Sequence, residues 1–306
     1  MWNDKRYHTF DYEMKKLFGE KAIKLSIDGG FTCPNRDGTI GLEGCIFCSE
    51  RGSGDFTSHW SKTITDQIHE QKEIMSRKWK SNTYIAYFQN YTNTYDTVEN
   101  LRKKYYEALS CEHIKSLAIA TRPDCISAEI LGLLEEINKK TALWIELGLQ
   151  TINDKSANFL RRGYKTEQFE QCFKLLKSKN IPTVVHLIFG IPGESKKDML
   201  DSVKYISRLN PWGVKIHMLH VLRNTDLASY YENNQFKLLS SEEYVDLVCD
   251  SLELFSPDTV IHRLTGDGKK SDLIEPRWSL NKLKVLSDID KELKLRDSFQ
   301  GKHLPL

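Results

Sequence analysis

Hydrophobic and polar positions follow two alternating periods along the chain from residue 21 onward. Short apolar segments suited to strands are separated by amphipathic segments with the period of a helix. This order is typical of βα units that assemble a parallel sheet. The expected strands are Lys21–Ile27, Thr83–Gln89, Ser116–Thr121, Ala142–Gln150, Thr183–Gly190 and Gly213–Val221. The expected helices are about Ser61–Trp79, Thr97–Ser110, Ser127–Asn138, Lys165–Ser178 and Ser195–Leu209, with Ser61 and Ser195 as candidate N-caps.

Polar positions within the strands favour a barrel over a flat sheet. In ALWIELGLQ (142–150), Trp144, Glu146, Gly148 and Gln150 share one face, and the other face is apolar. A strand covered by helices on both faces is apolar throughout. The pattern therefore predicts an α/β fold, an incomplete (βα)6 TIM-like barrel with a polar interior. Ligands of such barrels sit at the carboxyl ends of the strands.

The pattern changes after Val221. Ser240–Phe255 and Trp278–Leu293 are expected helices, 259–266 is one more expected strand, and 266–272 is a polar turn. We expect three segments: an N-terminal segment (1–20), the partial barrel (21–225) and a C-terminal α/β extension packed on the barrel (226–306).

Composition places the chain among soluble globular proteins. It has 306 residues, 40% hydrophobic and 28% charged, with a formal net charge of +2. That charge permits a nucleic-acid partner without requiring one. No segment approaches the ~18 apolar residues of a membrane helix, and MWNDKRYHTF lacks the apolar region of a signal peptide. We expect a cytoplasmic location, where clustered cysteines more often bind metal or act in catalysis than form disulfides.

A glycine-rich loop after the first expected strand carries Cys33, Cys45 and Cys48 in the spacing C-x11-C-x2-C. Thiolates bind zinc or iron–sulfur clusters. A structural zinc site closes its tetrahedron with a fourth ligand, and His59 is the nearest candidate. Three thiolates on a four-iron cluster leave one iron open to a ligand. The spacing alone leaves both metals possible. The remaining cysteines are expected to be small buried side chains: Cys111, Cys125, Cys172 and Cys249.

Several motifs resemble the radical S-adenosylmethionine (SAM) superfamily. Three close cysteines after the first barrel strand, with Phe47 before the last, are typical of that family, and the eleven-residue gap resembles its elongator-like branch. Further similar stretches are TRPD (121–124), ELGLQT (146–151), RRGYKT (161–166) and HLIFGIPGES (186–195). The resemblance spans roughly 20–225. HRLTGDG, PRWSLNK and DSFQGK resemble the short stand-alone bacterial branch, which is YtqA/MnmL-like.

The resemblance implies two cofactors. Cys33, Cys45 and Cys48 would hold a [4Fe-4S] cluster, and the amino and carboxylate groups of SAM would chelate the fourth iron. The resulting 5′-deoxyadenosyl radical abstracts hydrogen from an unactivated carbon. The cofactor carries this chemistry, while the protein positions it.

The same resemblance implies the residues around SAM. Gln89 and Asn90 are expected at the amino group of SAM, and Arg122 and Arg162 at its carboxylate. Glu146 and Gln150 are expected at the ribose. The residues expected at the adenine are Ile188, Gly190 and Pro192, and Phe47 is expected at the iron–sulfur cluster. Each also has an ordinary structural interpretation. The amides can cap loops, the arginines can brace backbone, and GIPG alone indicates a turn. A buried Glu146 requires a ligand or an arginine partner.

Two interior-facing histidines, His186 and His217, are candidates for substrate contact or proton supply. Satisfied interior histidines are the alternative interpretation. Tyr91 and Tyr95 could stack a base or quench a radical, and packing is the alternative for both.

Three functions stay open at this point. The branch resemblance implies a tRNA-modifying enzyme that converts the carboxymethylaminomethyl group on carbon 5 of wobble uridine toward aminomethyl. Its partners would be tRNA and an electron donor such as flavodoxin or ferredoxin. Basic stretches that could contact phosphates are Arg77–Lys80, Arg161–Lys165 and Lys269–Lys270. The second function is radical chemistry on a small metabolite or a protein side chain. The third is a zinc-binding protein without catalysis.

Overall fold

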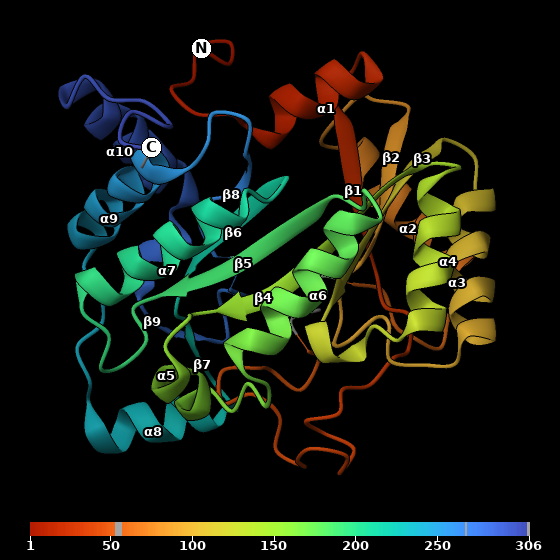
Figure 1. The fold of residues 1–306 in the computed structure, drawn as a ribbon, viewed down its shortest axis with the longest axis horizontal. Helices are drawn as coiled ribbons and strands as arrows, with labels where there is room; N and C mark the ends of the chain where they lie inside the picture. The colour runs from red at the N-terminus through yellow and green to blue at the C-terminus, as the bar shows by residue number, and fades with distance from the viewer. Residues whose placement is uncertain (53–56, 267, 305–306) are drawn as a thin grey trace.

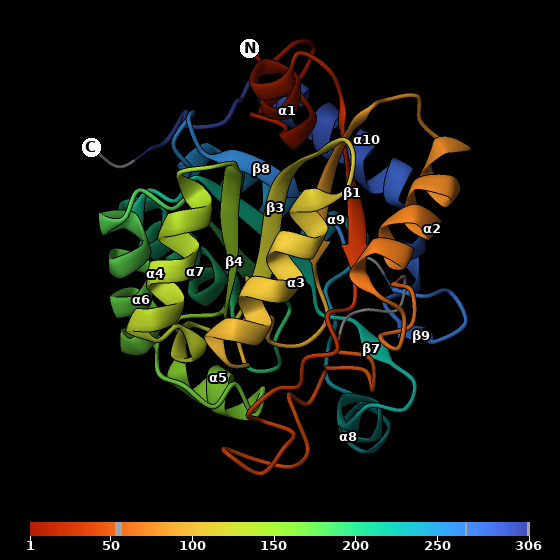
Figure 2. The same cartoon turned by 90° about the vertical axis from the view of Figure 1, so that its right-hand side faces the viewer.

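A computed structural model describes residues 1–52, 57–266 and 268–304. Seven parallel strands form one curled sheet in the order β1-β2-β3-β4-β5-β6-β8. Helices cover its outer face, as Figures 1 and 2 show. The predicted TIM-like partial barrel is confirmed, and the extension adds β8 to its sheet. The strands are β1 Ala22–Ile27, β2 Thr83–Phe88, β3 Ile114–Thr121, β4 Ala142–Gln150, β5 Thr183–Phe189, β6 Gly213–Met218 and β8 Val260–Arg263.

The helices on the outer face include all five that the periodicity predicts between the barrel strands. These are α2 Ile64–Ser76, α3 Val98–Ser110, α4 Ala128–Asn138, α6 Thr166–Ser178 and α7 Lys196–Leu209. Ser195 caps α7 as expected. The expected cap at Ser61 is wrong, because Thr63 receives the N–H of Asp66 and α2 begins later. Unpredicted helices are α1 Phe10–Phe18, α5 Asp154–Phe159 and α8 Asp226–Asn234.

The C-terminal part adds α9 Ser241–Leu254 and α10 Lys282–Leu295, which pack against each other beside α7. The sixth expected strand ends early, at Met218, and the chain then forms β7 Val221–Leu222, which pairs antiparallel with β9 Leu273–Glu275. The expected polar turn at 266–272 lies partly outside the described residues. Among the described residues, no helix combines the length and the apolar character that crossing a membrane requires.

Helix α1 packs against the interior of the barrel at the amino ends of the strands (Figure 1). Met14 of α1 is fully buried and packs in one cluster with the inward-facing Ile85, Trp144 and Val184. The preceding segment bridges to β8, where the Ile261 N–H donates to the carbonyl of His8 at 2.7 Å. Figures 1 and 2 place α1 at one end of the sheet, and α5, α8 and the loop after β1 at the other. The interior is therefore closed by apolar packing at the amino ends of the strands.

Candidate functional site

The loop that carries the three cysteines is anchored at the carboxyl end of the barrel. Ile46, inside the C-x-x-C motif, is 6% exposed and packs against Leu160, Leu219 and Leu227. Its N–H donates to the carbonyl of Leu160 at 3.2 Å, and its carbonyl accepts from the N–H of Leu227 at 2.9 Å. An apolar anchor between two cysteines fixes the loop without using a thiol. The unpredicted helices α5 and α8 supply both contacts.

Polar contacts organise the thiols themselves. Asn35 donates to the Cys45 sulfur at 3.5 Å and to the Arg161 carbonyl at 2.7 Å. Arg36 donates to the carbonyls of Cys48 and Ser49 at 3.0 and 2.9 Å. Burial, together with the nearby thiols of Cys48 and Cys33, raises the pKa of Cys45 to about 12. A thiolate at this position therefore requires a cationic ligand, which a metal supplies.

The donor set suits an iron–sulfur cluster better than one zinc ion. Within the described residues, no group of three or more His, Cys, Asp or Glu side chains could hold a single metal ion. His59, the expected fourth zinc ligand, is exposed, and its ring bonds to the Ser61 hydroxyl at 2.8 Å. Each thiolate of a cluster binds its own iron. The thiols of Cys33 and Cys48 lie near that of Cys45, so the three can each bind one iron of a cluster.

Asn90 lies at the carboxyl end of β2 with an unsatisfied acceptor. Its amide nitrogen donates to Asp28 at 2.6 Å and to the Thr57 hydroxyl at 3.1 Å. Its side chain is buried, and its carbonyl oxygen has no hydrogen-bond partner in the described structure. A buried unpaired acceptor is costly and therefore indicates a missing donor. The neighbouring Gln89 bonds its backbone N–H to the Ile27 carbonyl at 3.2 Å.

Gln150 presents a second acceptor of this kind at the end of β4. Its backbone has a φ of +64°, which a non-glycine residue rarely adopts. Its side-chain oxygen is buried and has no hydrogen-bond partner in the described part of the chain. Gly148 keeps the space open, because a Cβ there would come within 2.6 Å of the Gln150 amide nitrogen. Strained backbone and an orphaned acceptor together are typical of a ligand site.

The two arginines expected at the SAM carboxylate are engaged within the protein. Arg162 donates to the carbonyls of Leu149, Thr151 and Tyr164 and to the Thr166 hydroxyl. This use of the guanidinium differs from the expected role, because the backbone between β4 and α6 occupies it.

Arg122 forms a two-pronged pair with Asp124 at 3.0 and 2.7 Å and donates to the Arg162 carbonyl at 2.9 Å. Its guanidinium lies 4.9 Å from the centre of the Tyr164 ring. The fork that could grip a carboxylate is therefore already filled.

Glu146 lies inside the barrel and is 1% exposed. Five side-chain groups surround its two oxygens: Lys24 Nζ at 3.3 Å, Tyr87 Oη at 2.8 Å, Trp144 Nε1 at 3.2 Å, His186 Nε2 at 3.0 Å, and Lys215 Nζ. The expected arginine or ligand partner is thus replaced by two lysines. Despite burial, the charges of these lysines hold the pKa of Glu146 well below its usual range. The saturated carboxylate gives no support to the expected ribose contact.

His186 and His217 stand next to this network. Their ring centroids are 5.7 Å apart, and both rings are partly exposed. Burial, followed by the charge of Lys215, lowers the pKa of His186 to about 4. Burial and the charge of Arg263 hold the pKa of His217 well below its usual range. Both rings are therefore neutral near pH 7, so each has one N–H donor and one acceptor.

The residues expected near the cluster and the adenine surround the cysteine loop. Phe47 and Ile188 pack against a group of buried hydrophobic side chains that includes Ile46 and Ile191. Gly190 has a φ of +86°, and its N–H donates to the Met199 sulfur at 3.2 Å. Pro192 follows in the turn after β5 and is partly buried. Their assignment to cofactor binding stays a prediction.

The two candidate tyrosines hold the loop. Tyr91 donates its hydroxyl to the Glu50 carbonyl, and the Tyr95 hydroxyl lies 2.9 Å from that of Thr39. Packing on the loop is therefore the interpretation that these contacts support.

Two of the three basic stretches are poorly placed to contact an RNA phosphate beside the cysteine loop. Arg77–Lys80 lies between α2 and β2, at the amino ends of the strands. Arg161 pairs with Glu43 and Asp226.

Sequence reasoning missed four interior cations and histidines. Lys24, Lys215, Arg263 and His262 were not singled out from the sequence. A signal was present for Lys215, because it shares the strand face of His217. For Arg263 no local signal exists, because β8 shifts register against β6 to place it beside Lys215.

Comparisons with known proteins agree with this geometry. The "Radical SAM superfamily" model matches residues 33–206, and the "Radical_SAM C-terminal domain" model matches 211–295. The chain is 43% identical to YtqA of Bacillus subtilis over 98% of this chain and 93% of that protein. It is 31% identical to the tRNA uridine(34) acetyltransferase of Methanocaldococcus jannaschii, over 44% of this chain and 25% of that protein.

A solved structure shares the fold. The archaeal Methanocaldococcus infernus Elp3 with an N-terminal deletion superposes with a TM-score of 0.70 at 18% identity, covering 91% of this chain and 64% of that one. Because the family model spans more than half of the residues, the expectation of a non-catalytic zinc protein is wrong. The chain belongs to the radical SAM superfamily, a family of enzymes that use a [4Fe-4S] cluster and S-adenosylmethionine.

Proposed function

We propose that this enzyme modifies the carbon-5 side chain of wobble uridine in tRNA, converting carboxymethylaminomethyl toward aminomethyl. The observation that supports the substrate is its similarity to enzymes named for uridine 34 of tRNA, which spans 137 residues. The similarity covers 25% of the Methanocaldococcus jannaschii protein, and the acetyl transfer in its name is not part of the proposal.

The proposal gives the cysteine loop and the strand ends distinct roles. Cys33, Cys45 and Cys48 would hold the cluster, which together with SAM would supply the radical chemistry for hydrogen abstraction from carbon. The orphaned oxygens of Asn90 and Gln150 accept hydrogen bonds from SAM, at its ammonium and its ribose hydroxyls. The neutral rings of His186 and His217 face the substrate.

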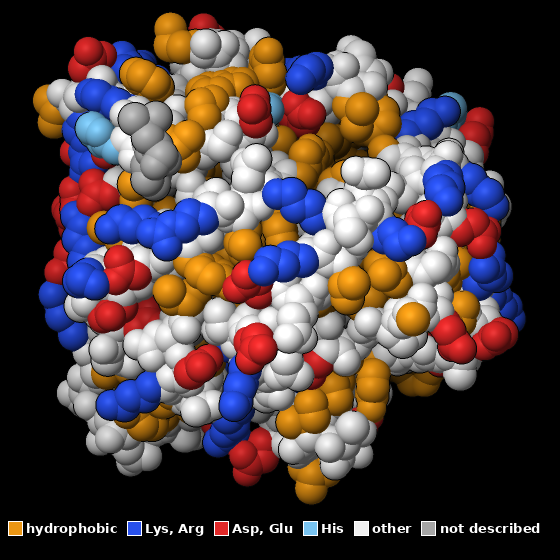
Figure 3. Space-filling view, in the orientation of Figure 1, with side chains coloured by type: hydrophobic (Ala, Val, Ile, Leu, Met, Phe, Trp, Pro, Cys, Tyr) orange, Lys and Arg blue, Asp and Glu red, His pale blue; other side chains and the backbone are white. Residues whose placement is uncertain are grey.

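A basic groove in the C-terminal part suits the RNA backbone. Lys270, Arg277 and Lys284 line a groove of about 560 Å³ together with Trp278, between the starts of α9 and α10. Cations beside an aromatic ring can contact phosphates and stack a base. By contrast, both signs of charge are interspersed on the face shown in Figure 3. Lys270 of the third basic stretch, Lys269–Lys270, therefore lies in the groove as a candidate RNA contact.

Mass spectrometry of tRNA nucleosides tests the function. A strain that lacks the gene should accumulate carboxymethylaminomethyluridine and lose aminomethyluridine and its products. The intact gene should restore them, and Cys48→Ala should not. Cys111→Ala, which removes a partly exposed thiol outside the loop, is the matched control and should restore them. An unchanged wobble-uridine profile in the deletion strain would refute the proposal.

The remaining assignments complete the proposal. The electron donor is a flavodoxin or ferredoxin, the location is the cytoplasm, and the segments are 1–20, 21–225 and 226–306. Radical chemistry on a small metabolite or a protein side chain is the outcome that an unchanged tRNA profile, together with 5′-deoxyadenosine formation, would favour.

A further inference from the structure

Among the described residues, two lysines inside the barrel share one carboxylate. Lys24 from β1, Lys215 from β6 and Arg263 from β8 lie around one carboxylate, that of Glu146. In the part of the chain that the structure describes, both Lys24 and Lys215 have Glu146 as their one acidic partner within ion-pair distance. One carboxylate neutralises one of the two lysines, so the pair retains an excess positive charge.

Holding that excess charge in the barrel is unfavourable without a further anion. Lys215 is 4% exposed, and removing an ammonium from water is unfavourable, which a shared partner offsets only in part. Burial, with added repulsion from Lys24 and Arg263, lowers the pKa of Lys215 to about 7 in spite of Glu146. An anion beside Lys215 would offset both effects.

The hydrogen bonds of Lys215 leave room for such an anion. An ammonium carries three N–H donors. One is directed to Glu146 and one to the Tyr87 hydroxyl at 3.2 Å, so the third has no partner among the described residues. Nearby, a ring nitrogen of His262 is buried without a hydrogen-bond partner among the described residues.

The strand register places Lys215 below His217, as seen from the cysteine loop at the carboxyl ends of the strands. His186, Lys215 and Arg263 are neighbours across β5, β6 and β8. His217 lies on the same face of β6, two residues nearer the carboxyl end, and pairs with Ile188. A group entering at the carboxyl ends of the strands therefore meets the partly exposed His217 first and the buried Lys215 next.

We propose that Lys215 and His217 bind a carboxylate on the substrate side chain, and that Glu146 positions Lys215 for this contact. The inference rests on the proposed function, whose substrate bears a carboxylate at the end of its carbon-5 side chain. A charge-assisted bond from the ammonium and a neutral N–H from the histidine suit one such group. The product, aminomethyluridine, lacks the carboxylate and loses both contacts.

Binding without turnover tests the contact. Anticodon stem-loop RNAs with carboxymethylaminomethyl, carbamoylmethylaminomethyl or unmodified uridine are titrated by fluorescence anisotropy against cluster-loaded protein without reductant. Wild type should prefer the carboxylate RNA to its amide by about tenfold. Lys215→Met should abolish that preference and leave the affinity for unmodified RNA unchanged. The matched control Lys24→Met removes a lysine from the other side of Glu146 and should keep the preference. Equal weakening for all three RNAs would overturn the proposal.

A second arm does not depend on tRNA being the substrate. The Cε1–H signals of His186 and His217 are followed by NMR during addition of N-methylglycine, N-methylethanolamine or inorganic phosphate. Saturable shifts with N-methylglycine alone, absent in Lys215→Met, support a carboxylate site even if every RNA binds equally. Shifts with phosphate alone identify a phosphate site and overturn the carboxylate assignment, and so does the absence of any shift.

Discussion

The ammonium of Lys215 lies against the carboxylate of Glu146 in the centre of the barrel, on strands separated by β5. Both side chains are almost fully buried, at 4% and 1% exposure. The carboxylate also accepts from Lys24, at 3.3 Å, so a single acid holds cations from β1 and β6. This arrangement joins opposite ends of an open sheet through charge rather than through strand pairing.

Replacement of this acid should destabilise the protein strongly. Glu146→Gln leaves two lysines without a carboxylate, and breaking a buried pair costs about 3–5 kcal/mol. Denaturant unfolding measures the loss. Glu135→Gln is the control, because Glu135 pairs with Lys139 and Lys179 near the surface, where such pairs contribute about 0–1 kcal/mol. Equal losses in both variants would contradict the role of the interior network.

Removal of a loop thiol should abolish the cluster. Cys33→Ala and Cys48→Ala each remove one of three thiols from the loop, whereas Cys249→Ala removes a buried thiol between α9 and α10. After anaerobic reconstitution, iron and sulfide analysis should give a full cluster for wild type and Cys249→Ala only. Full iron content in Cys48→Ala would show that another residue ligates the metal.

A glycine beside the loop should affect the cluster without contributing a ligand. Gly163 has a φ of +81°, and a Cβ there would lie 2.6 Å from Asn35 Oδ1. Gly163→Ala should displace the amide that bonds Cys45, lower iron retention and cost about 1–3 kcal/mol from backbone strain.

Gly132 in α4 is the matched glycine, because a Cβ there meets nothing within 4 Å. Gly132→Ala should retain all iron and stabilise the helix by about 0.5–1 kcal/mol. Equal iron loss in both variants would show that the effect is not local to Asn35.

Acid should destabilise the fold through His186. Its pKa falls from 6.5 to about 4 on folding, so between these values the unfolded chain binds a proton that the folded protein does not. The free energy of unfolding should therefore decrease as pH falls from 6.5 to 4, by on the order of 2–3 kcal/mol for this group. The charged groups that face it are Glu146, Lys215 and Arg263.

His186→Gln should flatten this dependence. Urea unfolding of the apoprotein at several pH values measures both slopes. Identical slopes for the variant and wild type would exclude His186 as the cause.

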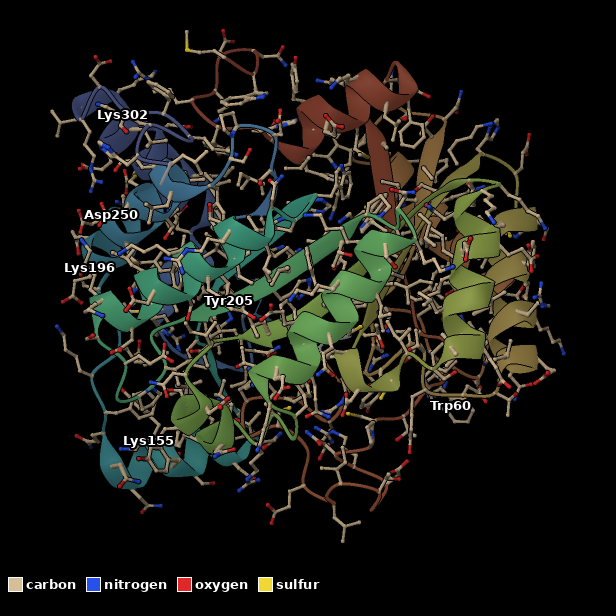
Figure 4. All side chains as sticks on the ribbon, in the orientation of Figure 1. Trp60, Lys155, Lys196, Tyr205, Asp250 and Lys302 are labelled. Atoms are coloured by element: carbon tan, nitrogen blue, oxygen red, sulfur yellow. The ribbon has the colours of Figure 1, made fainter. Side chains whose placement is uncertain are left out.

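Some aromatic and charged side chains lie at the periphery of the molecule. Figure 4 shows Trp60 at the periphery of the molecule, and Lys196 and Asp250 at the opposite side, where they pair at 2.6 Å. Trp60 and Lys196 are exposed, whereas Asp250 is partly buried and also pairs with Arg296.

Local patterns predicted the parts of the fold that depend on local physics. The period-2 alternation of 142–150 indicated a strand with a polar inner face, and Trp144 and Glu146 do lie inside. Ser195 caps its helix as predicted, because a side-chain oxygen three residues before an N–H needs no distant partner. The cysteine spacing likewise indicated a metal loop. Helices α5 and α8 escaped prediction because they are short and depend on contact with Ile46.

The sequence by itself determined the strand–helix order, the barrel class and the three-thiol loop, because each is encoded within a few neighbouring residues. Only the tertiary structure decided which polar side chains are available. Arg162 and Glu146 look like ligand residues in a strand or turn, yet carbonyls and lysines from distant segments consume their hydrogen bonds. Asn90 and Gln150 keep an open acceptor because no donor among the described residues reaches these buried oxygens. Satisfaction of a buried polar group depends on every element that packs around it, and curling of the sheet brings those elements together.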